Sequence, residues 1–138
     1  MEIHEREARL AVFIDFENLA LGFKGSKEKF DIARVLARLV EKGKIIVKRS
    51  YADWSRYTEY KRHFHEAAIE LIEIPKREMS GKNSADIRLV VDAMDLASAK
   101  AHIDTFVIVS GDSDFSPLVS KLKENGKYLI GLGMRGST

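Results

Sequence analysis

The sequence predicts a doubly wound α/β domain, in which helices cover both faces of a parallel sheet. Apolar stretches that end at polar residues alternate along the chain with stretches whose apolar residues recur at helical spacing. Strands that alternate with helices favour parallel pairing with right-handed crossovers. The chain has 138 residues and no internal repeat, linker or low-complexity segment, so we expect a single domain over residues 1–138.

The first expected strand covers residues 10–14, which are all apolar and are followed by Asp15. This pattern is typical of a strand buried on both faces of a sheet. Asp31 is placed to cap a helix that has Gly43 just past its end. The apolar residues at helical spacing in this helix are Ile32, Val35, Leu36, Leu39 and Val40. A second strand is expected over residues 45–51.

Residues 57–70 predict a helix, and residues 71–74 predict a short third strand that Pro75 ends. The apolar stripe of this helix consists of Tyr60, Phe64, Ala67, Ala68 and Leu71. A basic loop follows over residues 76–83.

Ser84 is placed to cap a long helix that continues to Ala101, and residues 105–109 predict the fourth strand. The residues expected to face the core from this helix are Ile87, Val90, Val91, Met94 and Ala97. Ser116 is placed to cap a short helix, Gly126 to end it, and a fifth strand begins over residues 128–130.

Composition limits the classes of function. The absence of cysteine excludes disulfides and thiolate-bound zinc and favours a cytoplasmic protein, so any metal is held by oxygen or imidazole. Residues 1–7 alternate in charge, unlike a signal peptide, and no run of about 18 apolar residues could span a membrane. The net charge of +2 by itself predicts neither a nucleic-acid nor a membrane partner.

Four aspartates are expected at one edge of the sheet. Asp15 follows the first strand, Asp112 and Asp114 follow the fourth, and Asp86 lies in the first turn of the helix before the fourth. Strand carboxyl ends and the following helix amino ends share one edge in such sheets. If the strand order is 3-2-1-4-5, the first and fourth strands are neighbours, and the repulsion among the carboxylates favours a bound cation. Oxygen ligands without cysteine indicate Mg²⁺ or Mn²⁺.

Two alternatives bear on these aspartates. A lone aspartate at a strand end is usually a turn or helix cap. Residues 112–116 also resemble the start of an EF-hand calcium loop, but Pro117 and Lys123 stand where that loop needs glycine and glutamate, so we reject it. If the four aspartates form one cluster, the rest of the chain has 23 basic against 17 acidic residues, which suits a polyanionic substrate.

Three motifs in order carry a resemblance to a known family: residues 12–19 (VFIDFENL), residues 83–87 (NSADI) continuing to 91–94 (VDAM), and residues 109–115 (VSGDSDF). They resemble the NYN branch of the PIN-like nucleases, close to bacterial proteins of the LabA type. The resemblance extends from about Leu10 to Leu132 and implies the strand order 3-2-1-4-5 and a magnesium-dependent ribonuclease site.

Matched to these motifs, the resemblance implies that Asp15, Asp86, Asp112 and Asp114 are the catalytic, metal-binding acids. It implies that Asn18 orients the site or touches the substrate. Asp92 also matches, but it lies about 240° around the helix from Asp86, and we expect it to have a supporting or structural role.

Other residues at the same edge are expected to bind substrate. Ser110 and Ser113 could hydrogen-bond phosphate or a water next to the metal, although Ser113 also suits a plain turn. Arg56 and Lys82 could follow a phosphate backbone. Trp54 and Tyr57 could stack on unpaired bases. The alternative for these last four residues is a solvated basic face with half-buried aromatic rings.

The predicted function is therefore a metal-dependent endoribonuclease that cuts single-stranded RNA with Mg²⁺ or Mn²⁺. The alternative is a non-catalytic RNA-binding or regulatory module with the same fold. A phosphatase with Asp15 as nucleophile is disfavoured, because Glu17 stands where the haloacid-dehalogenase pattern has a second aspartate. Relatives usually continue past the fifth strand, so this interpretation allows a chain truncated before an accessory RNA-binding domain, and it also allows a homodimer.

Overall fold

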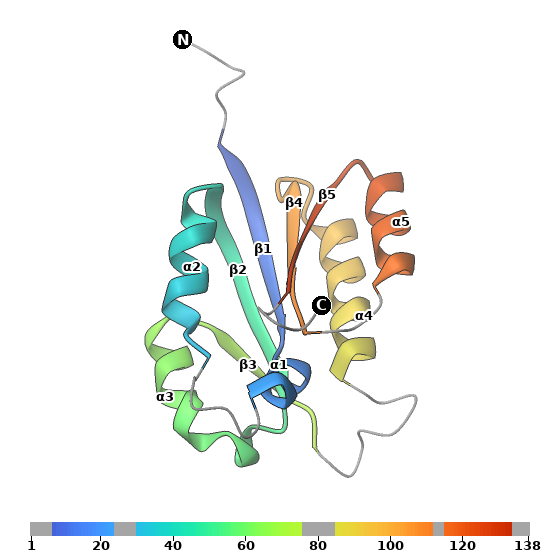
Figure 1. Cartoon of the computed structure of the whole chain (residues 1–138). Coiled ribbons are helices and arrows are strands. Elements are labelled where there is room, and N and C mark those ends of the chain that lie inside the picture. The colour runs from blue at the N-terminus through green and yellow to red at the C-terminus, as the bar shows by residue number, and fades with distance from the viewer. Residues whose placement is uncertain (1–6, 24–29, 76–84, 112–114, 134–138) are drawn as a thin grey trace.

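The computed structural model describes residues 7–23, 30–75, 85–111 and 115–133. They form a three-layer α/β domain with one sheet between two groups of helices (Figure 1). The elements are β1 (Ala8–Asp15), α1 (Phe16–Phe23), α2 (Ile32–Val40), β2 (Gly43–Ala52), a 3₁₀ turn η2 (Trp54–Arg56), α3 (Thr58–Glu66), β3 (Glu70–Glu73), α4 (Ala85–Ala99), β4 (Thr105–Val109), α5 (Ser116–Glu124) and β5 (Tyr128–Leu132).

The sheet has five strands in the order β3-β2-β1-β4-β5, and every neighbouring pair is parallel. Both the fold class and the strand order predicted from the sequence are confirmed. β1 occupies the centre, and the six residues from Leu10 to Asp15 are all buried. The chain passes from β1 to one side of the sheet and later to the other, so the order reverses between β1 and β4.

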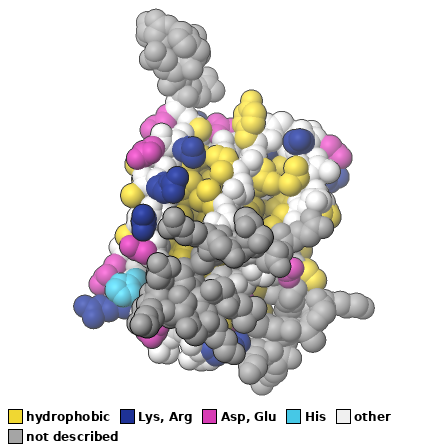
Figure 2. Space-filling model, viewed as in Figure 1, with side chains coloured by type: hydrophobic (Ala, Val, Ile, Leu, Met, Phe, Trp, Pro, Cys, Tyr) yellow, Lys and Arg dark blue, Asp and Glu magenta, His cyan; other side chains and the backbone are white. Residues whose placement is uncertain are grey.

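Side chains alternate between the two faces of the sheet, which separates the core into two clusters. One cluster contains Phe13 and Phe106 and is covered by α4 and α5. The other contains Val12 and Val107 and is covered by α1, α2 and α3. On the face shown in Figure 2, hydrophobic side chains reach the surface over part of the sheet. None of the helices within the described ranges is both long and apolar enough to cross a membrane.

Local signals at several element ends are confirmed. The Asp31 side chain accepts the backbone N–H of Arg34 at 3.3 Å and caps α2. Gly126 has φ +73° after α5, a left-handed conformation that glycine adopts without a steric penalty. The expected cap at Ser116 is wrong by one residue, because α5 begins at Ser116 and its cap position is Phe115.

The core-facing side of α4 differs from the prediction. Ile87 and Val91 are 42% and 49% exposed. The buried residues of α4 are Ala85, Leu89, Ala93, Leu96 and Ala97, while Val90 and Met94 pack at the margin of the core. The helix has apolar residues on most of its surface, so spacing alone could not select a face. The observed face places three alanines against the sheet, where small side chains permit close approach.

A partly buried hydrogen bond ties α4 to the sheet. The Tyr51 hydroxyl of β2 donates to Asp92 Oδ2 at 2.7 Å, and Arg88 Nε approaches both oxygens of the same carboxylate at 3.3 Å. Tyr51 is fully buried and lies against the Phe13 ring, with 6.5 Å between the ring centroids. Burial, and then Asp92, raise the pKa of Tyr51 above its ordinary value, so its hydroxyl stays a donor. The supporting role expected for Asp92 is therefore a contact between layers.

The helix predicted over residues 57–70 is shorter in the structure. η2 precedes it, and α3 ends at Glu66. The backbone N–H of Ile69 then bonds to Phe64 O at 3.0 Å, and Ala68 has φ +61°. This is a helix-ending motif whose left-handed position usually holds glycine. The predicted apolar stripe extended past the real end of the helix because it included Leu71, whose apolar side chain belongs to β3.

We predict that Ala68→Gly stabilises the protein by about 1 kcal/mol, because alanine is strained in the left-handed region and glycine is not. Ala68 is exposed, so no packing is lost. Urea unfolding measures the change. Ala37→Gly, at an exposed position inside α2, is the control and should destabilise by about 1 kcal/mol. Equal signs for the two variants would contradict the strain at Ala68.

We predict that Tyr51→Phe destabilises the protein by about 1–3 kcal/mol, because it removes the hydroxyl that donates to the charged Asp92 carboxylate and leaves Arg88 as the donor to that group. Urea unfolding at neutral pH again gives the measurement. Tyr128→Phe removes the same hydroxyl from a ring that is 71% exposed and should be neutral. A neutral Tyr51→Phe would mean that the bond contributes nothing net to the stability of the fold.

Candidate active site

Asp15 ends the central strand at the carboxyl edge of the sheet and is only 2% exposed. α1 begins at the next residue, and the backbone N–H of Asn18 donates to Asp15 Oδ1 at 3.3 Å. Asp15 therefore holds the cap position of α1, as the sequence alternative for a lone aspartate anticipates. The amino end of a helix also favours a negative charge. The carboxylate is thus held in one place by both the strand and the helix.

Ser110 lies beside Asp15. Ile14 and Val109 are partners in the parallel pairing of β1 with β4, so the next residues on the two strands are Asp15 and Ser110. Phe13 and Ile108, two residues earlier on the same strands, belong to the cluster under α4 and α5, and because side chains alternate, Asp15 and Ser110 are directed to that same face. The backbone N–H of Ser110 bonds to Leu132 O at 3.1 Å, which fixes its position against β5.

The hydroxyl of Ser110 has no partner. Ser110 is 9% exposed, and among the described residues its Oγ is the one buried side-chain polar atom without a hydrogen bond. Such a group costs about 1–3 kcal/mol relative to a satisfied one, so it calls for an explanation. A bound ligand or water at this edge would satisfy it.

The loop after β4 passes directly against α1. A Cβ built on Gly111 would lie 2.5 Å from Asn18 Oδ1, which is closer than atoms tolerate. Glycine is therefore required for the Asn18 side chain to lie over this backbone. The contact brings the segment that leads to Asp112 next to the first turn of α1, where Asn18 was expected to orient the site.

The remaining predicted acids are only partly described. α4 begins at the same end of the sheet at which β1 ends (Figure 1), and Asp86 lies in its first turn, where its Oδ1 accepts the Ile87 N–H at 2.9 Å. The described ranges contain no group of three acidic or histidine side chains arranged to hold a metal ion. Asp112, Ser113, Asp114 and Lys82 lie outside the described residues. The four-aspartate site therefore stays a prediction.

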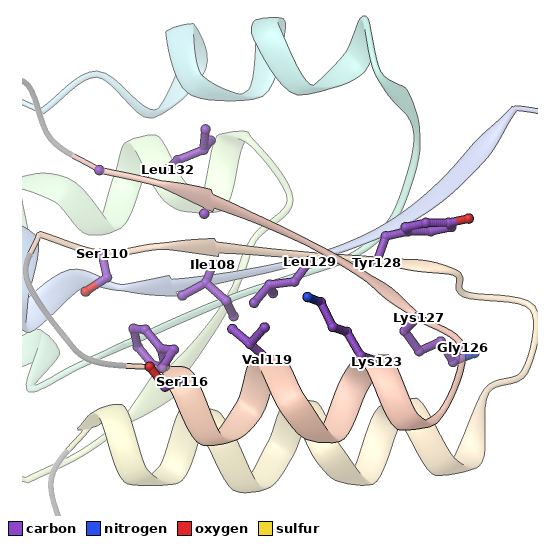
Figure 3. Close-up of a pocket in the computed structure, with 13 residues that line it drawn as sticks. Ile108, Ser110, Ser116, Val119, Lys123, Gly126, Lys127, Tyr128, Leu129 and Leu132 are labelled. Atoms are coloured by element: carbon purple, nitrogen blue, oxygen red, sulfur yellow. The ribbon is translucent and has the colours of Figure 1, made fainter.

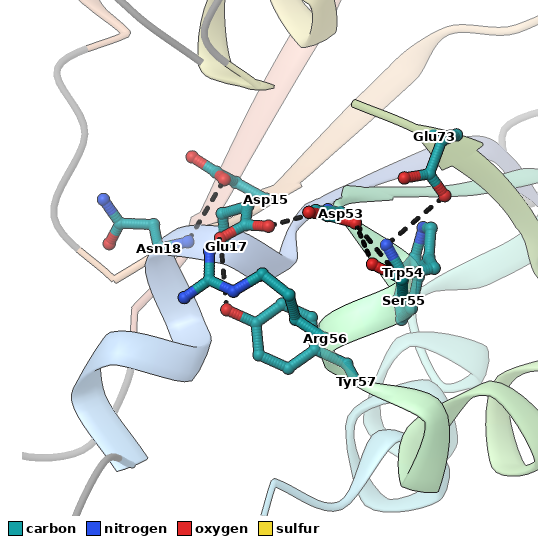
Figure 4. A network of polar contacts seen from close by, with 9 residues as sticks. All are labelled: Asp15, Glu17, Asn18, Asp53, Trp54, Ser55, Arg56, Tyr57 and Glu73. Atoms are coloured by element: carbon teal, nitrogen blue, oxygen red, sulfur yellow. Dashed lines mark hydrogen bonds and ion pairs between the residues drawn. The ribbon is translucent and has the colours of Figure 1, made fainter. Parts of the chain in front are cut away.

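Glu17 organises the other half of this edge, and the sequence analysis did not single it out (Figure 4). Its Oε2 accepts the backbone N–H of Asp53 at 2.7 Å, and its Oε1 accepts the Tyr57 hydroxyl at 3.1 Å and faces Arg56 Nη1 at 3.4 Å. One carboxylate from α1 thus fixes the loop after β2. The position of Glu17 in the first turn of a helix was the one signal in the sequence that could have indicated its role. Its partners lie far away in the sequence, so spacing could not reveal them.

Arg56 is held at the rim of the site. Its guanidinium pairs with Glu17 and lies 5.5 Å from the centre of the Tyr57 ring, and its side chain is 41% exposed. Burial, and next the Glu17 carboxylate, raise the pKa of Tyr57 to about 12. Arg56 is therefore an oriented cation with one side open to solvent.

The expectation that Trp54 stacks on bases is wrong. Trp54 is 2% exposed, and its ring stacks on Phe16 with 5.3 Å between centroids. Its indole N–H donates to Ile72 O at 3.2 Å. Tyr57 also packs edge-on against Phe16. Tyr57 is half-buried and fits the alternative of a basic face with half-buried aromatic rings, whereas Trp54 is buried more fully than that alternative expected.

Two further carboxylates close the loop after β2. Asp53 Oδ1 accepts both the N–H and the hydroxyl of Ser55, at 3.3 and 2.6 Å, and so caps η2. Glu73 Oε1 accepts the Trp54 N–H at 3.3 Å. Desolvation raises the pKa of Glu73 above its ordinary value; the Trp54 N–H opposes this shift, and the neighbouring Asp53 side chain adds to it. These acids have structural partners, which separates them from the open position around Ser110.

Comparisons with known proteins bear on the fold and the family. A crystal structure of a protein of unknown function, VPA0982 from Vibrio parahaemolyticus RIMD 2210633, has the same fold, with a TM-score of 0.78 and 20% identity over 100% of this chain and 88% of that one. The uncharacterized protein MJ0482 of Methanocaldococcus jannaschii is 33% identical over 128 residues, which are 92% of this chain. The chain spans about half the length of that relative, 48%.

The family comparison covers the described sheet and its carboxyl edge. Residues 9–138 match the family described as NYN domain, which is nearly the whole chain. The match includes Asp15, Asn18, Asp86 and Ser110, the residues placed above. The chain therefore belongs to the NYN domain family, a nuclease-like family with the PIN-like fold.

Proposed function

We propose that this domain is a metal-dependent endoribonuclease of the LabA-like kind, which hydrolyses phosphodiester bonds of single-stranded RNA with Mg²⁺ or Mn²⁺. The observation that carries the proposal is the buried Asp15 carboxylate beside the unpartnered Ser110 Oγ, at the point where the strand order of an NYN domain reverses. Ligands bind at such reversal points in open α/β sheets.

The residues present fit a hard divalent cation. The donors at this edge are carboxylate and hydroxyl oxygens, and neither cysteine nor thiolate is available. Asp15 would hold the cation together with Asp86, Asp112 and Asp114. When bound, the cation lowers the pKa of a coordinated water and neutralises charge on the phosphate. The buried, unpartnered hydroxyl of Ser110 supports this fit, because it offers a hydrogen bond that nothing else in the described protein takes.

The protein's own residues have distinct tasks in this proposal. Asn18 fixes Asp15 through its backbone N–H and brings the loop after β4 close through its contact with Gly111. Ser110 donates to a phosphate oxygen or to the attacking water, and Ser113 has the same chemistry. Arg56, oriented by Glu17, and Lys82 attract the flanking phosphates.

A non-catalytic RNA-binding module is the second candidate. Its support is the bond between Asp15 and the Asn18 N–H, which gives this acid a structural task without any metal. An RNA-binding domain outside these residues would be compatible with either function.

We predict that millimolar Mn²⁺ raises the melting temperature, because binding to the folded state alone stabilises it by about 2.7 kcal/mol at a hundredfold excess over Kd. For a domain of this size the shift is about 4 °C per kcal/mol. Asp15→Asn should abolish most of the shift while keeping the helix cap, since asparagine caps as well as aspartate. Asp95→Asn, at an exposed position of α4, should keep the full shift. An unchanged wild-type midpoint would argue against a metal site.

We predict that Asp15→Asn lowers cleavage of single-stranded RNA by about a hundredfold or more, because loss of a metal ligand removes several kcal/mol of transition-state stabilisation. Asp112→Asn should act alike. RNA affinity should change much less in both variants, since lysine and arginine carry it. Cleavage is measured with Mg²⁺ or Mn²⁺ on preparations made in parallel, with Asp95→Asn as the control. Equal cleavage by all of them would indicate a contaminating ribonuclease, and binding without any cleavage would favour the non-catalytic module.

A further inference from the structure

A groove of about 830 Å³ lies between α5 and the last two strands of the sheet, next to the candidate active site (Figure 3). Ser110 lines one end of it, and Lys123 lines it farther along α5. Its apolar lining consists of Ile108, Phe115, Val119, Leu129 and Leu132. We propose that this groove binds one nucleotide of the single-stranded RNA, next to the phosphate that is cut. The inference rests on the proposed function and adds a place for the substrate.

The end of the groove at the active site is suited to a phosphate. Ser110 is more than nine-tenths buried, its Oγ has no partner, and Figure 3 shows this oxygen pointing away from the strands, on the side where α5 starts. α5 begins with Phe115 at its cap position, and that side chain makes no capping hydrogen bond. A helix amino end attracts anions through its N–H groups and its dipole. The hydroxyl and the helix end therefore face the same anion.

The charged side chains that line the groove are all positive. Its lining residues include two lysines and no carboxylate. Lys127 is occupied, because its Nζ donates to Ile103 O at 2.7 Å and to Ala101 O at 3.3 Å. Lys123 has no ion pair or hydrogen bond among the described residues, and Figure 3 shows its Nζ directed into the groove. It stands about 10 Å along α5 from the helix start, so it can meet a different phosphate of the strand from the one at the helix start.

The floor of the groove is left open by a glycine. Gly131 lies inside β5, two residues after Leu129, so both face α5. A Cβ built on Gly131 would meet no atom within 4 Å, and hence packing does not require glycine there. A glycine inside a strand weakens it and often marks a place where a ligand approaches closely. The apolar walls with this flat floor fit a base and a ribose.

An apolar protein segment is the competing occupant. It would use the same walls, and its backbone could hydrogen-bond the Ser110 hydroxyl, but it would leave the Lys123 ammonium without a negative partner. Burying such a group unpaired carries a free-energy penalty. The charge therefore favours the phosphorylated ligand.

The first test measures binding of a labelled single-stranded RNA by fluorescence anisotropy in EDTA, so that it does not depend on cutting. Gly131→Leu fills the groove and should weaken binding by about tenfold or more, the effect of losing a stacked base. Lys123→Ala should lower the dependence of log Kd on log salt by about 0.7, one phosphate contact. Lys121→Ala removes the same charge from the same helix, but Lys121 pairs with Glu124 outside the groove, and it should behave as wild type.

The second test separates a ligand-binding role of Ser110 from a structural one. Ser110→Ala should weaken RNA binding in EDTA while leaving the melting temperature unchanged or higher, because it removes a buried polar group that has no partner in the protein. Adenosine monophosphate should compete with the RNA for wild type and not for Gly131→Leu, whereas adenosine should compete far less.

The outcomes distinguish the two proposals. Wild-type RNA affinity in both Gly131→Leu and Lys123→Ala overturns the groove, as does equal competition by adenosine and its monophosphate. If Ser110→Ala lowers the melting temperature, the hydroxyl has a structural role, and this result also counts against the proposed groove. If the groove variants lose RNA binding while the wild type never cleaves, the groove stands and the nuclease function fails.

Discussion

The parallel pairing of β1 with both β2 and β4 is the constraint on which the rest of the structure depends. β1 is buried on both faces, so it is excluded from the sheet edges and must end where its two neighbours end. This places Asp15 in line with Tyr51 on one side and Ser110 on the other. The same alternation of side chains that separates the two cores directs these three polar groups to the α4 side. The candidate site is thus a direct consequence of where the central strand stops.

The three polar groups at this edge differ in what they cost the fold. Tyr51 is buried with its donor satisfied by Asp92, and that bond joins α4 to the sheet. Asp15 is buried with the Asn18 N–H as one partner. Ser110 is buried with none, and alanine would fit there with less penalty. Natural proteins break local rules mainly at functional positions, which makes the unsatisfied hydroxyl more informative than the satisfied ones.

The parts of the fold that the sequence predicted are those with local causes. The strand at residues 105–109 is one apolar run, and the Asp31 cap and the Gly126 turn each depend on neighbours a few residues away. The errors have distant causes. The face of α4 that packs on the sheet meets residues far away in the sequence, such as a tyrosine 41 residues before Asp92, and Glu17 bonds to partners 36 to 40 residues later. Trp54 lies two residues before Arg56, in a basic setting that suits base stacking, but Phe16 from another element packs against its ring and helps to bury it. Periodicity and motif carry no information about such pairings.

The two proposed sites share Ser110, and the sheet geometry sets how a strand of RNA would pass between them. The groove lies on the β5 side of Ser110, Asp15 lies on the β1 side, and Arg56 follows β2 beyond it. From β5 to β2 is three strand spacings, or about 14 Å, so only a few nucleotides separate the groove from Arg56. A hydroxyl can donate one hydrogen bond and accept two, which lets Ser110 contact a phosphate shared by the two sites. An RNA strand bound across the carboxyl ends of the strands would therefore have its scissile phosphate fixed by the position of Ser110 relative to Asp15. Which phosphodiester bond is cut would then follow from the sheet register and not from the identity of the bases.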